Sequence, residues 1–473
     1  MQCRNAGRLN ESVFSLVQPF APNLLVDIIR IAYLQPQEVT VMSERCYKIK
    51  GGSKLNGTIS VSGAKNAISK QLVASLLTGD SCTFTNVPDI VEIKTVLGML
   101  AEIGAEYSWS DRRLIIKTSK IANAGISQKF AKYNRIPILF IGPLLHRAGE
   151  AEVPIMGGCR IGSRPIDFHI EVLKTLGAEV EVTENSYKVR ADRLKGASIS
   201  LNYPSVGATE NAIISSVLAE GTTVISNAAI EPEIIDTILF LQKMGAHIMV
   251  DVDRRIVIEG VKSLRGATHR TLPDRIEVAS FAVAAVATDG EIEIENARQE
   301  DLVTFLNVLR QVGGGFKVKD SGITFFRERA LSSVHVETDV HPGFMTDWQQ
   351  PFVVMLTQAS GTSVVHETVY EKRFGYTETL NEMGADIELL NTCLGSKTCR
   401  FRDRDYKHSA IVRGPTRLKA SRIEIPDLRA GFAHVIAALM AEGTSEIHGI
   451  EYLERGYANV PEKLKAIGVS IET

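Results

Sequence analysis

Hydrophobic and polar positions repeat along this chain in units of about 70 residues. Each unit has a turn glycine, a short alternating strand, a helical stretch, and a leucine shortly before a second glycine. The glycine pairs are Gly79 and Gly104, Gly149 and Gly177, Gly221 and Gly245, Gly290 and Gly313, Gly361 and Gly384, and Gly443 and Gly468. The step to the last unit is longer, about 82 residues. We therefore predict six copies of one structural unit.

The third unit illustrates the local prediction. Residues 233–244 have apolar positions at helical spacing, and Gly245 suits the left-handed position that follows a helix. Residues 211–220 are apolar on nearly every face, which indicates a buried helix. Val224 alternates with polar neighbours, as in a strand. Each unit is therefore predicted to be a small α/β fold with two helices and a few strands.

Six buried helices favour helical cores with sheets outside them. A linear solenoid is the alternative, since repeated units often stack in a row. A solenoid does not need a fully apolar helix in every unit, whereas three units that meet around one helical core do. We therefore predict two compact α/β domains with a cleft between them.

The composition narrows the function classes. The 473 residues are 44% hydrophobic and 23% charged, as in a globular protein. A net charge of −2 and 6% aromatic residues give no reason to expect nucleic acid or a membrane surface as a partner. Six scattered cysteines are no disulfide framework, which favours a reducing compartment such as the cytoplasm. No apolar run is long enough for a transmembrane helix.

Residues 1–41 precede the repeats. Arg4 and Arg8 stand before an apolar stretch, as in a secretory signal. Pro19 and Pro22 interrupt that stretch, and no small-residue cleavage site closes it, so we expect no export. The segment is interpreted as an N-terminal extension, either a helical appendage or sequence upstream of a start at Met42.

Common cofactor motifs are absent from the sequence. It has no G-x-x-x-x-G-K-[ST], G-x-G-x-x-G, H-E-x-x-H or C-x-x-C pattern, so we expect neither a cofactor nor a metal. Cys393 and Cys399 lie in a basic stretch, for which a solvated hairpin is favoured over a metal site. Ser62 to Lys65 matches the S-x-x-K pattern of penicillin-binding enzymes, but the partner motifs are missing.

Charged residues on turns are the remaining candidates. Lys65 is expected to begin a helix, where anions bind well. Cys159 stands among glycines and beside Arg160 and Arg164, whose charges favour the thiolate and suggest a reactive thiol. The alternative for Cys159 is a buried structural cysteine. The other candidates are Arg135, Asp347, Asp427, Arg429 and Arg455.

Seven motifs carry a resemblance to a known family. They lie at residues 62–67, 157–165 (Gly-Gly-Cys-Arg-Ile-Gly-Ser-Arg-Pro), 205–211, 231–236, 272–277, 341–347 and 455–457. In this order they resemble the UDP-N-acetylglucosamine 1-carboxyvinyltransferases, enolpyruvyl transferases of peptidoglycan synthesis. The resemblance implies a two-domain inverted α/β barrel of six βαβαββ repeats. It also implies a discontinuous first domain of residues 42–64 plus 273–473, and a second domain of residues 65–272.

The resemblance implies an addition–elimination reaction. The enolpyruvyl group of phosphoenolpyruvate passes to the 3′-hydroxyl of UDP-N-acetylglucosamine, and phosphate is released without a cofactor. This reaction is the first committed step of peptidoglycan precursor synthesis, on which cell wall biogenesis, cell shape and cell division depend. Cys159 occupies the family's proton-donor position, where its pKa can be tuned toward neutral pH. Fosfomycin alkylates the same position in the family.

Further positions are implied by the same resemblance. Lys65, Asn66, Arg164 and Arg455 match residues that hold phosphoenolpyruvate, and Asp347 matches the base for the sugar hydroxyl. The positions that match the nucleotide-sugar site are Asn66, Arg135, Arg164, Pro165, Ile166, Asp167, Phe168, Tyr203, Pro204, Ser205, Val206, Asp347 and Val369. Arg373, Asp427 and Arg429 match supporting positions, with a helix N-cap as the alternative for Asp427.

The chain also departs from the family. Tyr203 replaces a lysine of some members, Leu139 replaces a tryptophan, and residues 390–412 are longer than usual. Two alternative functions remain at this point. The sister enzyme 5-enolpyruvylshikimate-3-phosphate synthase shares the fold but lacks the Gly-Gly-Cys loop. An inactive paralogue that binds the nucleotide sugar would not need the intact set of Lys65, Cys159, Arg164, Asp347 and Arg455.

Overall fold

The computed structural model describes residues 45–473 apart from 157–165, 397–398 and 403. The N-terminal extension and the Cys159 loop lie outside the described residues. By its contacts the chain divides into Met1–Glu44 and Arg45–Thr473, and the fold below is that of the second unit. Within the described residues, no helix combines the length and the apolar character needed to cross a bilayer.

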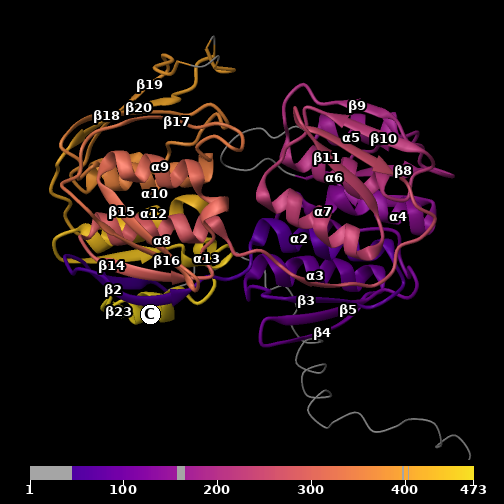
Figure 1. Cartoon of the computed structure of the whole chain (residues 1–473), viewed down its shortest axis with the longest axis horizontal. Helices are drawn as coiled ribbons and strands as arrows, with labels where there is room; N and C mark the ends of the chain where they lie inside the picture. The colour runs from indigo at the N-terminus through magenta and orange to yellow at the C-terminus, as the bar shows by residue number, and fades with distance from the viewer. Residues whose placement is uncertain (1–44, 157–165, 397–398, 403) are drawn as a thin grey trace, which may run out of the picture. The chain divides into compact units, whose positions relative to one another are not determined.

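Six small sheets are present in this part of the chain, one for each predicted repeat (Figure 1). Three of them, in spatial order, are β13 (Thr268–Arg270), β3 (Cys82–Thr85), β5 (Arg113–Lys117), β4 (Glu106–Ser110); β6 (Glu150–Pro154), β8 (Ser186–Arg190), β7 (Glu179–Val182); and β11 (His247–Asp251), β12 (Arg255–Glu259), β10 (Thr222–Ser226), β9 (Ser198–Ser200). The other three are β15 (Gly314–Lys319), β16 (Gly322–Arg327), β14 (Glu291–Glu295), β2 (Asn56–Ser60); β17 (His335–Glu337), β18 (Gly361–His366), β20 (Ser409–Gly414), β19 (Asp386–Leu390); and β21 (Arg422–Glu424), β22 (Thr444–His448), β1 (Tyr47–Lys50), β23 (Ile471–Glu472).

The sheets share one plan. In each four-stranded sheet one pair is parallel and the other two pairs are antiparallel, as a βαβαββ unit requires. The three-stranded sheet adds its parallel neighbour through a single bridge between Gly125 and Glu152. Ile225 of β10 and Ile256 of β12 are register partners, and both are buried. One face of β10 and β12 therefore packs inward, as the alternating pattern predicts.

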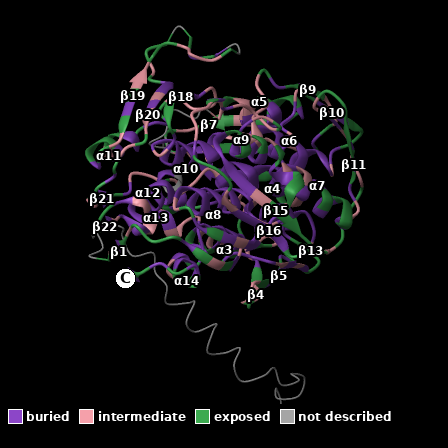
Figure 2. Ribbon diagram, turned by 60° about the vertical axis from the view of Figure 1, so that its left-hand side comes forward, coloured by how far each residue is buried: buried purple, intermediate pink, exposed green. Residues whose placement is uncertain are grey.

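A buried helix lies inside each repeat. These helices are α2 (Lys65–Ala74), α4 (Ile141–Ala148), α6 (Val206–Ser216), α8 (Arg275–Ala287), α10 (Thr346–Leu356) and α12 (Leu428–Met440). Every residue of α8 is buried, and so is every residue of α10 except Asp347 (Figure 2). Helices α8, α10 and α12 pack against one another, and α4 with its leading turn η3 (Ile136–Phe140) contacts α2 and α6. The prediction of helical cores is confirmed, because each set of three helices shares one interior.

A second helix in each repeat ends at a predicted glycine. These outer helices are α3 (Val91–Ile103), α5 (Asp167–Thr175), α7 (Pro232–Met244), α9 (Val303–Val312), α11 (Thr377–Glu382) and α14 (Val460–Ala466). The glycines that follow them, at 104, 177, 245, 313, 384 and 468, have φ angles from 88° to 121°. Residues with a Cβ avoid this region, so glycine is required there. The remaining short elements are η1 (Ser75–Leu77), η2 (Gln128–Phe130), η4 (Gln299–Asp301) and α13 (Ile450–Glu454).

Two hydrophobic cores result. One draws on residues 47–61 and 278–471, and the other on residues 68–264 together with Ala458. The chain passes between them twice, because β2 pairs with β14 whereas the next strand, β3, pairs with β13. The two passages lie side by side: the Ala64 N–H donates to Leu272 O at 2.7 Å, and the Asp274 N–H donates to Ser62 O at 2.9 Å. The domain division predicted after residues 64 and 272 remains a prediction, with both boundaries at these passages.

The left-handed glycine after α7 provides a test of the repeat rule. Gly245 has a φ of 107° and open space where a Cβ would lie, so Gly245→Ala costs backbone strain without a clash. We expect a loss of about 1–2 kcal/mol, seen as a lower unfolding midpoint in urea. Gly375 has equally open space and no left-handed φ, so Gly375→Ala is the matched control and should not lower the midpoint. Equal midpoints for the two variants would contradict the assignment.

Candidate active site

The structure confirms the predicted place of Lys65 at the start of a helix. β2 ends at Ser60 and α2 begins at Lys65, so the ammonium lies at the positive end of the helix dipole. Its Nζ lies 3.9 Å from Oε2 of Glu92, which is buried in the first turn of α3. The neighbouring Asn66 is held through its carbonyl, which accepts a hydrogen bond from Lys70 Nζ at 2.8 Å.

Arg455 reaches the same carboxylate from the far end of the sequence. It follows α13 directly, and its Nη2 lies 3.4 Å from Glu92 Oε2 and donates to the carbonyl of Tyr133. Lys65 and Arg455 therefore share one buried carboxylate oxygen. Two cations against one carboxylate leave a net positive charge, which suits an anionic ligand. Sequence analysis did not find Glu92, because a glutamate in a first helical turn is common and carries no distinguishing pattern.

Asp347 and Arg373 form a second charged pair. Asp347 lies in the first turn of α10, and its Oδ1 is in contact with Arg373 Nη2. The arginine side chain is 1% exposed, whereas that of Asp347 is 14% exposed. The guanidinium also lies 5.2 Å from the ring centre of Tyr370. The pair fixes the carboxylate in position, and the Asp347 side chain remains partly exposed.

Glu367 organises the turn beside this pair. It follows β18, is fully buried, and accepts hydrogen bonds from Thr346 Oγ1 at 2.9 Å, from the Val369 N–H at 2.8 Å and from the Tyr370 N–H at 3.0 Å. Burial raises the pKa of Glu367, although Arg373 opposes the rise. In the sequence, this residue is distinguished only by its place directly after an apolar strand.

Tyr203 and Val369 meet around an arginine of the longer segment. The Arg400 guanidinium lies 5.0 Å from the ring centre of Tyr203, and its Nη2 donates to the carbonyl of Val369. Arg400 also lies 3.6 Å from Glu371 Oε1. Burial raises the pKa of the Tyr203 hydroxyl, so this side chain stays neutral. Two predicted nucleotide-sugar positions are thus brought together by a residue that the sequence analysis treated only as part of a basic stretch.

The prediction of a solvated hairpin for that stretch is wrong in part. Cys399 is 5% exposed, and Phe401 and His408 are fully buried. The rings of Phe401 and His408 lie 5.8 Å apart. Apolar and aromatic side chains within the segment therefore form a small interior, which the density of basic residues concealed.

Arg135 lies close to a buried histidine. It precedes η3, and its charge adds to burial in lowering the pKa of His169 to about 4. His169 in α5 is therefore neutral, and its carbonyl accepts from Asn211 Nδ2 at 3.3 Å. Arg135 therefore lies near enough to the first turn of α5 for its charge to act there, close to the predicted residues 166–168.

The predicted residues 166–168 and 203–206 occupy the turns before two helices. Ile166 precedes α5, Asp167 is exposed in its first turn, and Phe168 is half-buried. Ser205 caps α6, because its Oγ accepts from the Ala208 N–H at 3.4 Å, which gives this residue a structural role. Pro204 precedes this cap, and Val206 is the first residue of the helix.

The remaining predicted residues fall into two groups. Asp427 accepts a hydrogen bond from the Ala430 N–H at 3.1 Å at the start of α12, in agreement with its N-cap alternative. Arg429 lies in the first turn of α12, and its side chain is outside the described part of the structure. Cys159, Arg164 and Pro165 also lie outside the described residues.

Two ion pairs are buried among helices α2, α6, α7 and α8. Arg275 donates to both carboxylate oxygens of Glu233 at 3.0 Å, and both side chains are almost fully buried. Lys70 lies 3.5 Å from Oε1 of Glu210. Burial raises the pKa of Glu210 to about 7, although Lys70 opposes the rise. The ionisation of these buried side chains therefore depends on their contacts with one another.

Comparison with known proteins places these features in one group of enzymes. Residues 49–464 match the family model of EPSP synthase (3-phosphoshikimate 1-carboxyvinyltransferase). The chain is 52% identical over 433 residues to the UDP-N-acetylglucosamine 1-carboxyvinyltransferase of Protochlamydia amoebophila, covering 90% of this chain and 93% of that protein. It is 49% identical to the enzyme of the same name from Chlamydia pneumoniae, covering 90% and 94%.

Solved structures share the fold. The enolpyruvyl transferase NikO from Streptomyces tendae superposes with a TM-score of 0.79 at 22% identity, over 90% of this chain and 98% of that one. EPSP synthase from Acinetobacter baumannii gives a TM-score of 0.71 at 16% identity, over 90% and 100%. The predicted two-domain inverted α/β fold is therefore confirmed.

The pH dependence of stability tests whether burial raises the pKa of Glu210. Its raised pKa means that the folded chain holds this proton more tightly than the unfolded chain, so its stabilising contribution is complete below the unfolded pKa and is lost as pH rises through about 7. Glu210→Gln removes that dependence. Between pH of about 5 and about 8, the unfolding midpoint of the variant should therefore rise relative to that of the unmodified chain. Glu181→Gln, at an exposed site, should show a constant difference. The same constant difference for Glu210→Gln would refute the interpretation.

Proposed function

The chain belongs to the UDP-N-acetylglucosamine 1-carboxyvinyltransferase family, and on that premise we propose that it transfers the enolpyruvyl group of phosphoenolpyruvate to the 3′-hydroxyl of UDP-N-acetylglucosamine. The observation that carries the proposal is the identity of about half of all residues across more than nine-tenths of relatives with that name. The match to the 3-phosphoshikimate enzymes is more distant, since their solved structures share only 16% of residues.

The proposed phosphoenolpyruvate site is the cation pair around Glu92. Phosphoenolpyruvate carries a carboxylate and a phosphate, and Lys65 and Arg455 together supply a compact charge and a planar fork for such groups. Glu92 holds both cations at one point, which lowers the entropy lost when the ligand binds. Arg164 is proposed as a third cation on the strength of its motif alone.

The proposed chemistry is an addition followed by an elimination, and each step moves protons. The Cys159 thiol gives its proton to C3 of the enol while the sugar 3′-oxygen attacks C2 and its proton passes to the Asp347 carboxylate. The resulting tetrahedral intermediate then returns a C3 proton to the Cys159 thiolate. The bond from C2 to the phosphate oxygen breaks, and the departing phosphate takes the proton held by Asp347. Arg373 is proposed to keep the carboxylate of Asp347 in place, as their buried contact supports. No step in this sequence requires oxidation or reduction.

The proposed nucleotide-sugar site lies at Tyr203, Val369 and Arg135. Tyr203 offers an aromatic face and Val369 a backbone turn, both in contact with Arg400, which adds a positive charge suited to a diphosphate. Arg135 beside the start of α5 provides a further cation near residues 166–168. We also propose that the enzyme acts in the cytoplasm in the first committed step of peptidoglycan precursor synthesis, and that fosfomycin alkylates Cys159.

A phosphate-release assay tests the proposal directly. With phosphoenolpyruvate and UDP-N-acetylglucosamine together, the purified chain should release phosphate, and neither substrate alone should give release. Turnover with shikimate 3-phosphate in place of the nucleotide sugar would favour the sister enzyme instead. Calorimetric binding of the nucleotide sugar without any turnover would indicate an inactive paralogue.

Substitution of Cys159 tests the proton donor. Cys159→Ser should lower kcat by at least about 100-fold while the nucleotide sugar still binds, because general acid catalysis typically contributes that much. Cys159→Asp should retain turnover, since a carboxyl can also donate a proton, and should no longer react with fosfomycin.

Intact-mass analysis after fosfomycin treatment, followed by peptide mapping, should locate one adduct on Cys159. Cys46 is a partly exposed free thiol and serves as the control that stays unmodified. An adduct on Cys46 instead, or a drug-sensitive Cys159→Asp variant, would remove Cys159 from the proposed role.

A further inference from the structure

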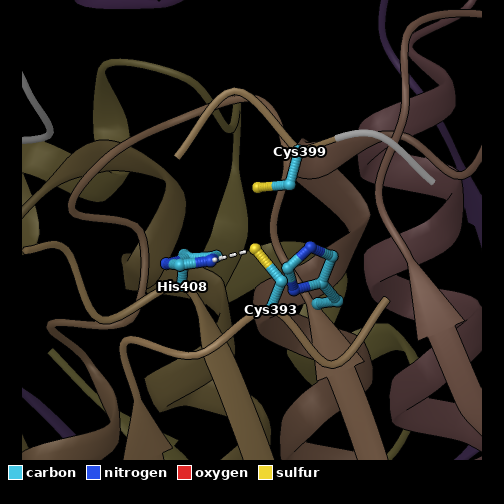
Figure 3. A group of neighbouring side chains, drawn as sticks. Cys393, Cys399 and His408 are labelled. Carbon is cyan, nitrogen blue, oxygen red and sulfur yellow. Dashed lines mark hydrogen bonds between the residues drawn. The ribbon is translucent and has the colours of Figure 1, made fainter. Parts of the chain in front are cut away.

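Four side chains with metal-binding chemistry converge where the connection between β19 and β20 meets the end of β18. They are His366, Cys393, Cys399 and His408, and their candidate donor atoms all lie within 4.8 Å of one another. Figure 3 labels Cys393, Cys399 and His408 of this group. His366 is the last residue of β18, and His408 directly precedes β20. Both cysteines lie in the connection between β19 and β20. We propose that these four residues bind one Zn²⁺ ion in a closed, structural site.

The hydrogen bonds of His408 leave its outer nitrogen ready to coordinate a metal. Its Nδ1 lies 2.6 Å from the carbonyl oxygen of Tyr406, and a carbonyl can only accept, so Nδ1 carries the hydrogen. The lone pair is therefore on Nε2, which lies 3.2 Å from Cys393 Sγ. A backbone carbonyl that orients the second nitrogen is the usual support of a metal-binding histidine.

The same reasoning fixes the tautomer of His366. Ser409 Oγ donates its hydrogen to the Thr392 carbonyl at 2.7 Å, so it can only accept from His366 Nδ1, 2.8 Å away. The lone pair of His366 is therefore on Nε2, which is buried and has no hydrogen-bond partner among the described residues. A buried nitrogen without a partner is costly, and a metal ion would satisfy it.

The two sulfur atoms complete the set. Cys399 Sγ accepts a hydrogen bond from the Phe401 N–H at 3.3 Å, which stabilises a thiolate. Binding of Zn²⁺ displaces the two thiol protons to solvent, and the two thiolates neutralise the charge of the ion.

The donor set selects zinc. Two thiolates and two neutral imidazoles form a common structural zinc set, with tetrahedral bonds of about 2.3 Å to sulfur and about 2.0–2.1 Å to nitrogen. Those bond lengths separate the donor atoms by roughly 3.3–3.8 Å. The 3.2 Å between Cys393 Sγ and His408 Nε2 is close to this range, and the widest separation in the group must shorten by about 1 Å.

The surroundings also fit such a site. At Gly395 an added Cβ would lie 2.3 Å from Cδ2 of His366, so only glycine lets the loop pass this close to the ring. A pocket of about 490 Å³ opens beside Cys393 and provides a path for the ion. Its lining residues are Asn391, Thr392, Cys393, Arg402, Arg404 and Asp405.

The ion would fix the position of Arg400. This residue directly follows Cys399 and reaches Tyr203 and Val369. A metal that ties the loop to the end of β18 removes conformational freedom from the loop and holds the guanidinium at those two residues. This consequence rests on the proposed function, whereas the metal site itself does not.

Metal analysis of the full chain tests the site. The chain, purified without a metal-binding tag and under reducing conditions, should contain one zinc per molecule by inductively coupled plasma mass spectrometry. The double variant Cys393→Ser/Cys399→Ser should retain less than about one tenth of that amount. Cys46→Ser is the matched cysteine control and should keep the full amount. Circular dichroism checks that each variant is folded.

Cobalt substitution and thiol titration supply independent readouts. Co²⁺ in the unmodified chain should give the visible absorption of a tetrahedral cobalt–thiolate site, and the double variant should not. A chain that takes up no zinc or cobalt would overturn the proposal, as would equal uptake by the double variant. A disulfide between Cys393 and Cys399 would also overturn it, and the denatured, chelated chain would then titrate two fewer thiols than the six in its sequence.

The link to the nucleotide-sugar site has its own test. Arg400→Ala should keep its zinc and raise the KM for UDP-N-acetylglucosamine by about 5- to 10-fold, with the KM for phosphoenolpyruvate unchanged. Removal of zinc from the unmodified chain should raise the same KM. An unchanged KM in both cases would refute the link. If the chain shows no turnover at all, the proposed function fails while the metal content still decides the site.

Discussion

The buried carboxylate of Asp236 binds the backbone at Leu272, where the chain passes from one hydrophobic core to the other. Its Oδ2 accepts hydrogen bonds from the Leu272 N–H at 3.1 Å and from Gln71 Nε2 at 2.7 Å, and its Oδ1 lies 3.0 Å from His269 Nε2. Glu233 stands one turn earlier on α7 and binds Arg275, the first residue of α8. A buried carboxylate is tolerated only when its lone pairs are satisfied, so these donors and the crossing fix one another.

The position of the candidate active site depends on this passage between the cores. Lys65 follows the first passage directly, and Ser62 within that passage donates its N–H to Oε2 of Glu277 at 3.0 Å. Glu277 in turn contacts Lys463 from the C-terminal repeat. Buried carboxylates therefore hold cations from distant parts of the sequence. Glu92 contacts Lys65 and Arg455, and Glu277 contacts Lys463. Losing one partner of such a buried pair costs about 3–5 kcal/mol, because the other charge remains buried and uncompensated.

The connection between β19 and β20 is stabilised differently from the two cores. The connection between β19 and β20 has few apolar side chains of its own, and its interior consists mainly of Phe401 with His408 and the cysteines. A loop of this length seldom holds one shape by packing alone. Metal ligation supplies the missing constraint in small units whose core is too small. In this chain, such a constraint would bring Arg400 to residues that belong to distant repeats.

The repeat plan was determined by the sequence itself. Glycines such as Gly245 and Gly104 require a left-handed backbone, and helices that are apolar on nearly every face, such as 211–220, must be buried. Local chemistry therefore sufficed for six units and their helical cores. The place of Lys65 at a helix start followed from the same local pattern. Tertiary structure alone decided which distant groups meet.

No local rule links Glu92 to Arg455, Asp236 to Leu272, or Arg400 to Tyr203, because each contact joins residues that are far apart in the sequence and become neighbours only in the folded chain. The group of His366, Cys393, Cys399 and His408 was found only in part: the sequence drew attention to Cys393 and Cys399, favoured a solvated hairpin there over a metal site, and linked neither histidine to them. Its spacing matches no short motif, and its members converge only because strand pairing brings the end of β18 beside the start of β20.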